Sequence, residues 1–165
     1  LRFAADELPG LLPGRSAVID GGMERLGVLG ELDPSIAAAF DFRGGGYLFE
    51  IDVGAVARAL ERHPRRYQPV SRYPAVEEDL SFLVDAACPA GDLAAEIEAA
   101  PLVERAAVFD VYTGEGLPAG KKSIAFSVTY RAPDRTLTND DIGRTRRRLV
   151  ERLAREFGAE LRGGP

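Results

Sequence analysis

The last part of the chain carries a series of strand and helix patterns whose order constrains the fold more than any other feature. Alternating apolar and polar residues predict strands, and apolar residues at helical spacing predict helices. The predicted strands cover 78–85, 103–112, 123–130 and 159–162, and the predicted helices cover 89–99 and 138–157. The resulting β-α-β-β-α-β order predicts two helices on one face of a four-stranded sheet, which is the ferredoxin-like arrangement.

The second of these helices has clear sequence signals at both ends. Thr138 is expected to cap its first turn, where Asp140 and Asp141 face the positive end of the helix dipole. Gly158 is expected to end it in a left-handed conformation. Arg146 falls within the apolar sector, and its guanidinium is expected to reach solvent. The apolar sector that should face the sheet contains Ile142, Leu149, Val150, Leu153 and Phe157, and the opposite side carries Arg144, Arg148, Arg152 and Arg155.

A proline-rich stretch over 62–74 predicts a linker, so we expect one domain over 1–66 and a second over 67–165. In the first domain Asp33-Pro34 is a typical helix start, and 8–14 is expected to be irregular. The first domain is predicted to have strands over 15–19, 25–32 and 47–51 and helices over 34–40 and 53–60. Such a small α+β fragment would bury a small core, so its strands are expected to complete a sheet begun upstream of Leu1.

The composition excludes several kinds of chemistry within this chain. With one histidine, His63, and one cysteine, Cys88, the chain cannot form an intramolecular disulfide or a site with several histidine ligands. We also expect no Ser–His–Asp or Cys–His catalytic set. His63 is expected to be a solvated linker residue. Cys88 is expected to be a packed or capping residue, although a helix dipole could lower its pKa. The acidic pairs at 77–79 and 140–141 are explained by a strand start and a helix start, so we expect no catalytic residues and no metal site.

No apolar run approaches the ~20 residues that cross a membrane, and we expect a cytoplasmic protein without a membrane partner. Charge is distributed unevenly along the chain. Residues 67–120 contain 2 basic and 10 acidic side chains, whereas residues 121–165 contain 11 basic and 6 acidic ones. A basic last third is compatible with nucleic-acid binding and also with an ordinary solvated helix.

Two surfaces of the second domain are candidates for RNA binding. One is the sheet face without helices, bordered by cations at Lys121, Lys122, Arg131 and Arg135, and the other is the outer side of the long helix. Alternation predicts that Ala107, Phe109 and Val111 share the opposite, covered face of their strand. The open face is predicted to show Ser81, Leu83, Val108, Asp110, Tyr112, Ser123, Ala125, Ser127 and Thr129.

Several motifs of the second domain resemble the ferredoxin-fold anticodon-binding domain of bacterial phenylalanyl-tRNA synthetase β subunits. The matching stretches are SRYPAVEEDLSFLVD (71–85), VFDVYTGEGLPAGKKSIAFSVTYRAPDRTLTNDDI (108–142) and FGAELR (157–162). PGLLPGRSAVID (9–20), LGVLGELDP (26–34) and YLFEIDVGAV (47–56) resemble the inactive, class II synthetase-like domain that precedes it. Glu78 departs from the family pattern, which usually has arginine there.

The resemblance implies an RNA-binding module that positions tRNA-Phe for aminoacylation by the α subunit of an ATP-dependent ligase. It implies that the partners of this chain are tRNA-Phe, the α subunit and the upstream β-subunit domains, within a heterotetramer. It also implies no cofactor in this fragment, since ATP and magnesium are used elsewhere in the enzyme. The RNA-contacting residues that we expect are Arg72, Ser81, Tyr112, Lys121, Lys122, Ser123, Arg131 and Arg135.

Two alternatives belong to other functional classes. The chain could be an assembly element of the β subunit without RNA affinity of its own. It could also be a ferredoxin-like domain that binds a small regulatory molecule, because this fold serves many purposes. This last hypothesis requires a ligand-sized pocket, and the sequence shows no group of polar residues that would converge on one.

Overall fold

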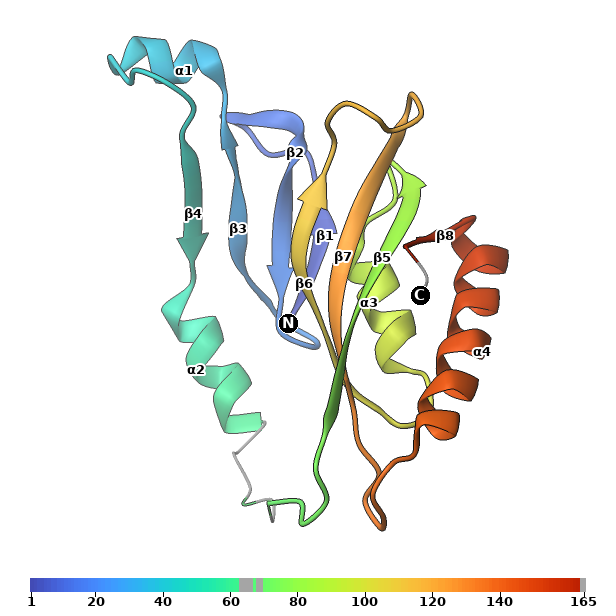
Figure 1. The fold of residues 1–165 in the computed structure, drawn as a ribbon. Helices are drawn as coiled ribbons and strands as arrows, with labels where there is room; N and C mark the ends of the chain where they lie inside the picture. Colours follow the sequence, from blue (N-terminus) through green and yellow to red (C-terminus); the bar gives the residue numbers. More distant parts are fainter. Residues whose placement is uncertain (63–66, 68–69, 164–165) are drawn as a thin grey trace. The chain divides into compact units, whose positions relative to one another are not determined.

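The structure is a computed structural model that describes residues 1–62, 67 and 70–163. The chain divides into two compact units, Leu1–Gln68 and Pro69–Pro165 (Figure 1). The predicted boundary after residue 66 adjoins residues outside the described ranges and stays a prediction, and His63 also lies outside those ranges.

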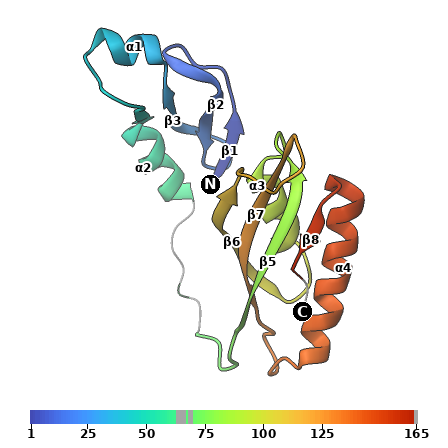
Figure 2. The same ribbon diagram turned by 45° about the horizontal axis from the view of Figure 1, so that its top comes forward.

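The first unit is an antiparallel four-stranded sheet in the order β1-β2-β3-β4, with two short helices next to β4 in the sequence (Figure 2). Its elements are β1 (Arg2–Ala5), β2 (Leu11–Asp20), β3 (Arg25–Leu32), α1 (Pro34–Ala39), β4 (Tyr47–Ile51) and α2 (Val53–Arg62). The predicted start of α1 is confirmed, because the Asp33 carboxylate accepts the Ser35 N–H at 2.8 Å and Pro34 opens the helix. The antiparallel α+β prediction holds for this unit.

Two features of this sheet differ from the prediction. β1 was not predicted, because four residues are too few to show a periodic pattern, yet all four pair with β2. β2 begins at Leu11 instead of residue 15. Its pairing with β3 shifts register between Leu11 and Ser16, so a bulge accommodates Pro13 and Gly14 within a strand.

The core cluster of the first unit is small and contains Ile19, Leu26 and Ala55 with a few partly buried neighbours. Leu11 and Ala37 are also buried. All five residues of β4 are exposed, and Tyr47 and Phe49 are among them. That the strands complete a larger sheet stays a prediction.

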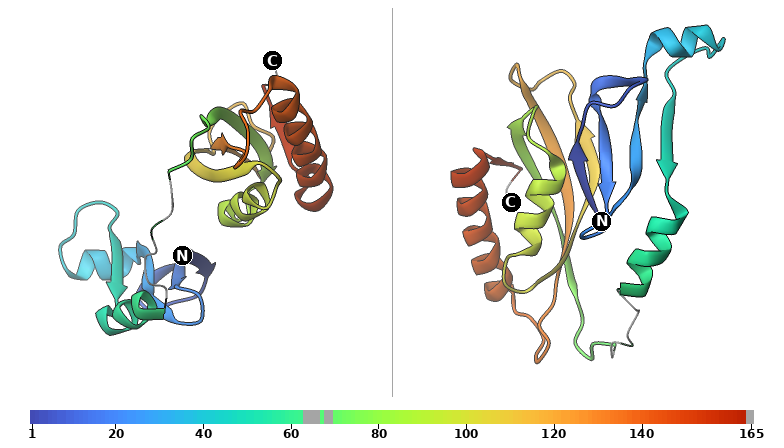
Figure 3. Two further views of the ribbon diagram at one scale, coloured as in Figure 1. Left: turned by 90° about the horizontal axis from the view of Figure 1, so that it is seen from below. Right: turned by 180° about the vertical axis from the view of Figure 1, so that it is seen from behind.

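The second unit contains β5 (Val76–Asp85), α3 (Ala90–Glu98), β6 (Val103–Tyr112), β7 (Lys121–Tyr130), α4 (Asn139–Phe157) and β8 (Glu160–Arg162). Its strands lie in the order β6-β7-β5-β8, and every neighbouring pair is antiparallel. Both helices lie against one face of the sheet, and no described helix of this unit covers the other face (Figure 3). The ferredoxin-like prediction is confirmed.

Both predicted ends of α4 are present. The Thr138 hydroxyl accepts the Asp141 N–H, and the Asp141 carboxylate accepts the Thr138 N–H, which makes a reciprocal capping box. Gly158 ends the helix with a φ of 60°. Leu149 and Leu153 are buried, as the apolar sector predicts.

The core of this unit fills the space between the helices and the sheet. Phe82 on β5 and Phe126 on β7 are completely buried, with ring centroids 6.3 Å apart in an edge-to-face arrangement. Leu93 and Ile97 contribute from α3. Cys88 packs at the margin of this core, and burial raises the pKa of its thiol, as expected for a packed cysteine.

The predicted faces of β6 are partly wrong. Val108 lies opposite Phe126 in register and therefore faces the helices, whereas Ala107 lies opposite Ser127 on the open face. The reason is a register shift between Val108 and Asp110, which a strict alternation cannot anticipate. Phe109, at this bulge, is 58% exposed instead of buried.

Candidate nucleic-acid interface

The open sheet face is built by every second residue of β5 and β7 and by the residues of β6 that pair with them. Phe82 and Ile124 point into the core, so their neighbours Ser81 and Ser123 point to the open face. Tyr112 lies opposite Ser123 in register and shares that face. The structure therefore brings together three of the predicted RNA-contacting residues.

These three residues differ in how accessible they are. Ser81 and Ser123 share a hydrogen bond of 2.9 Å between their hydroxyl groups. Ser123 is only 6% exposed, whereas Tyr112 is 45% exposed. Tyr112 is therefore the member of this group that can offer a broad aromatic surface to a ligand.

The loop after β6 holds the Tyr112 side chain. Its hydroxyl donates to the Glu115 carbonyl oxygen at 3.0 Å. A Cβ atom added at Gly114 would collide with the Tyr112 ring, so the ring lies directly on this glycine. The loop glycine and the Glu115 carbonyl were not among the predicted site residues, because the sequence shows no signal for such a contact.

Three of the predicted cationic residues are engaged within the protein. Lys121 Nζ lies 2.7 Å from the Asp85 carboxylate, and Arg131 Nε lies 2.9 Å from that of Glu104. Arg131 also donates to the Tyr73 carbonyl oxygen. These ion pairs reduce the positive charge that the predicted site presents.

Arg135 is held most firmly of the three. Its guanidinium donates to both carboxylate oxygens of Asp141, which also accepts from Arg144. Arg135 is the largest cause of the lowered pKa of Asp141, and the Thr138 hydrogen bonds lower it further. Asp141 is buried, so its ion pair with Arg135 stabilises the start of α4.

Arg72 and Lys122 make no ion pair with a described residue. Arg72 is exposed. Lys122 lies opposite Val84, which is fully buried in the core, so Lys122 belongs to the helix side of the sheet and not to the open face.

The eight predicted residues do not form one cluster. Lys121 begins β7 and Arg131 follows its last residue, which places them about 30 Å apart along the strand. Ser81, Tyr112, Lys121 and Ser123 lie toward one end of the sheet, and we call them the Tyr112 cluster. Arg72, Arg131 and Arg135 lie at the other end.

The arginines of α4 also have partners that the helical spacing did not predict. Arg146 Nη1 pairs with Glu78 on β5, and the Tyr130 hydroxyl donates to the same carboxylate. Burial, followed by the Glu78 charge, raises the pKa of Tyr130. Arg152 was predicted on the outer side, but it binds Glu96 on α3 with an Nε–Oε1 distance of 2.7 Å.

The described part of the chain shows no group of three His, Cys, Asp or Glu side chains that could hold a metal ion. Within the same ranges, no helix is long and apolar enough to cross a lipid bilayer.

Comparisons with known proteins assign both units. Residues 71–162 match the family model "Ferredoxin-fold anticodon binding domain", and residues 1–53 match "Phenylalanyl tRNA synthetase beta chain CLM domain". The chain is 42% identical over 161 residues to the phenylalanine–tRNA ligase beta subunit of Moorella thermoacetica, a match that covers 96% of this chain and 20% of that protein.

The corresponding subunit of Geobacillus kaustophilus is 40% identical over 155 residues, which cover 93% of this chain and 19% of the relative. The phenylalanine–tRNA ligase beta subunit of Thermotoga maritima is 35% identical over 166 residues, which cover 97% of this chain and 20% of the relative. The chain thus spans about a fifth of the length of the curated relatives it matches. The first unit is similar to the CLM domain of phenylalanyl-tRNA synthetase β chains, and the chain belongs to the ferredoxin-fold anticodon-binding domain family.

Proposed function

We propose that the second unit binds the anticodon stem-loop of tRNA-Phe through its open sheet face. The chain would then act as part of a cytoplasmic, ATP-dependent phenylalanine–tRNA ligase. Other segments would carry the amino acid, ATP and magnesium, and this segment would need no cofactor. Its further partners would be the α subunit and the upstream β-subunit domains.

The observation that carries this proposal is the half-exposed Tyr112 ring on a sheet face without a helix. Proteins that recognise single-stranded RNA loops stack unpaired bases on such aromatic rings. The Ser81 hydroxyl on the same face, which bonds to Ser123 opposite Tyr112, can also bond to base edges.

Electrostatics favours a selective, moderate interaction over tight general binding. Lys121 and Arg131 are already paired with carboxylates, so few cations remain to displace counterions from RNA phosphates. We therefore expect weak affinity that decreases as the salt concentration rises, with a smaller slope than that of a protein that neutralises many phosphates.

Fluorescence anisotropy with a labelled tRNA-Phe anticodon stem-loop at low salt tests the proposal. Tyr112→Ala should weaken binding roughly 5- to 100-fold, because stacking on an aromatic ring contributes about 1–3 kcal/mol per base. Tyr112→Phe, which keeps the ring, should retain most of the affinity. Tyr47→Ala removes an exposed aromatic ring from the first unit and serves as the matched control, with no expected change. Equal affinities for Tyr112→Ala and the parent chain would reject this site.

The second candidate function is an assembly element, and the exposed apolar strand β4 favours it. This function predicts no stem-loop binding at low salt together with self-association of the chain in analytical ultracentrifugation. Replacing Tyr47 and Phe49 by lysine should then reduce self-association. If the parent chain binds the stem-loop and Tyr112→Ala abolishes this binding, an assembly element without RNA affinity is excluded.

A further inference from the structure

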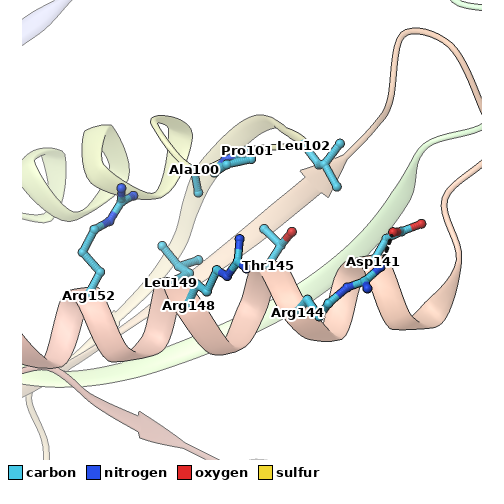
Figure 4. A pocket seen from close by; sticks show the side chains of 9 residues that line it. All are labelled: Ala100, Pro101, Leu102, Asp141, Arg144, Thr145, Arg148, Leu149 and Arg152. Carbon is cyan, nitrogen blue, oxygen red and sulfur yellow. Dashed lines mark hydrogen bonds and ion pairs between the residues drawn. The ribbon is translucent and has the colours of Figure 1, made fainter.

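The helix side of the second unit contains a pocket of about 430 Å³ between α4 and the connection from α3 to β6 (Figure 4). Its apolar wall comes from Ala100, Leu102 and Leu149. Arg144, Arg148 and Arg152 extend from successive turns of α4 along it. The volume lies in the range of small-molecule sites, and such sites combine an apolar lining with a few polar groups.

The charges around this pocket leave one guanidinium without a counterion. Arg144 Nη2 lies 2.8 Å from the Asp141 carboxylate, and Arg152 lies against Glu96. Arg148, between them, makes no ion pair with any described residue. The pocket therefore combines one uncompensated positive charge with an apolar wall.

Arg152 adds a second polar feature at the α3 end of the pocket. Its Nε is buried and has no acceptor in hydrogen-bond geometry among the described residues, although the Glu96 carboxylate is 2.7 Å away. That distance describes an ion pair whose N–H direction is poor. The Arg152 guanidinium also donates from Nη2 to the Glu96 backbone carbonyl oxygen, so Glu96 fixes its position at the edge of the pocket.

Leu102 lines the pocket in an unusual backbone conformation. Its φ is +67°, a region that bulky side chains rarely adopt. The Arg131 N–H donates to the Leu102 carbonyl oxygen at 2.8 Å and holds this conformation. Such strained residues are concentrated at ligand sites, where the surrounding structure maintains them.

We propose that this pocket binds a small monocarboxylate with an aliphatic body. The carboxylate pairs with Arg148, and the aliphatic body packs on Ala100, Leu102 and Leu149. A polyanion such as an RNA backbone fits less well, because Asp141 and Glu96 neutralise the flanking arginines and leave one cation, which matches a single negative charge. The site lies on the face of the sheet that the RNA proposal leaves unused, and it is independent of that proposal.

An NMR titration of the ¹⁵N-labelled chain with cyclohexylacetate tests the proposal, with the neutral cyclohexylacetamide as the ligand control. We expect saturable shifts in the amides of 100–102 and 144–152, and weak or no shifts with the amide. Arg148→Gln should raise the dissociation constant roughly tenfold or more, because it removes the charge-assisted pair. Arg147→Gln, at the next position of α4, should leave the dissociation constant unchanged. Arg147 does not line the pocket, is exposed and makes no ion pair with a described residue.

A second variant tests the apolar wall. Leu102→Asn replaces the apolar side chain by one that also tolerates a positive φ. This variant should bind cyclohexylacetate several-fold more weakly than the parent chain. The proposal is overturned if the carboxylate gives no saturable shifts, if the amide binds equally well, or if Arg148→Gln and Arg147→Gln behave alike. Displacement of the carboxylate by an anticodon stem-loop would also overturn it, since the pocket would then be an RNA contact.

Discussion

Ion pairs within the second unit determine which cationic side chains remain available to a ligand. The sequence predicts Arg131 and Arg135 as cations bordering the sheet, and it contains no signal that Glu104 and Asp141 bind them. Glu104 lies on β6, and only the folded topology brings it next to Arg131 after β7. Asp141 lies six residues after Arg135, on the first turn of α4, where the sequence predicts a helix start and not an ion pair. Residue types at this site were therefore predictable, whereas their net charge was not.

Asp141 predicts a specific pH dependence at the residue scale. The folded state lowers the pKa of Asp141, so its contribution to stability is complete above the unfolded-state pKa of about 4 and is lost as the pH falls through the folded-state value. Asp141→Asn should lower the melting temperature at pH 7, and the difference from the parent should shrink below about pH 4. Thermal melts between pH 3 and pH 7 measure this, and a difference that stays constant over that range would contradict it.

Leu102 predicts an inverted order of two substitutions. At an ordinary position glycine is less stable than alanine by about 0.5–1 kcal/mol. At a φ of +67° alanine keeps the unfavourable conformation and glycine relieves it, so Leu102→Gly should be more stable than Leu102→Ala by roughly 0.5–1 kcal/mol. Urea unfolding of the two variants measures their free energies of unfolding. A Leu102→Ala variant more stable than Leu102→Gly would show that the backbone at this residue is not strained.

At the scale of elements, α4 was predicted almost completely and β6 was not. Thr138, the apolar spacing of Leu149 and Leu153, and Gly158 are local signals that act within one helix. The faces of β6 depend instead on its register with β7, which shifts twice between Val103 and Asp110. Register shifts arise from pairing between strands, so a single-strand pattern cannot reveal them.

Replacement by alanine should change the stability in opposite directions at Gly143 within α4 and at Gly158, the residue that ends it. A Cβ at Gly143 would meet no atom within 4 Å, so Gly143→Ala should raise the free energy of unfolding by about 0.5–1 kcal/mol through a smaller loss of backbone entropy. A Cβ at Gly158 also has space, but its φ of +60° disfavours alanine, and Gly158→Ala should cost about 1 kcal/mol. Chemical denaturation measures both changes, and the same sign for both would contradict the helix-end assignment.

At the scale of the molecule, the two units differ in how complete they are. The second unit buries residues from both helices and three strands in one core. The first unit has three buried apolar residues in its core cluster and an exposed apolar strand, β4. The second unit therefore has a large core of its own, whereas the first unit leaves much of its apolar surface exposed.

The most direct test of the central claim is an NMR chemical-shift map of the whole chain with the tRNA-Phe anticodon stem-loop at low salt. The proposed function predicts the largest shifts at Tyr112, Ser123 and Ser127 on the open sheet face, with small changes at Arg147 and Arg148 on α4. Shifts confined to α4, or none at a stem-loop concentration well above that of the protein, would contradict it.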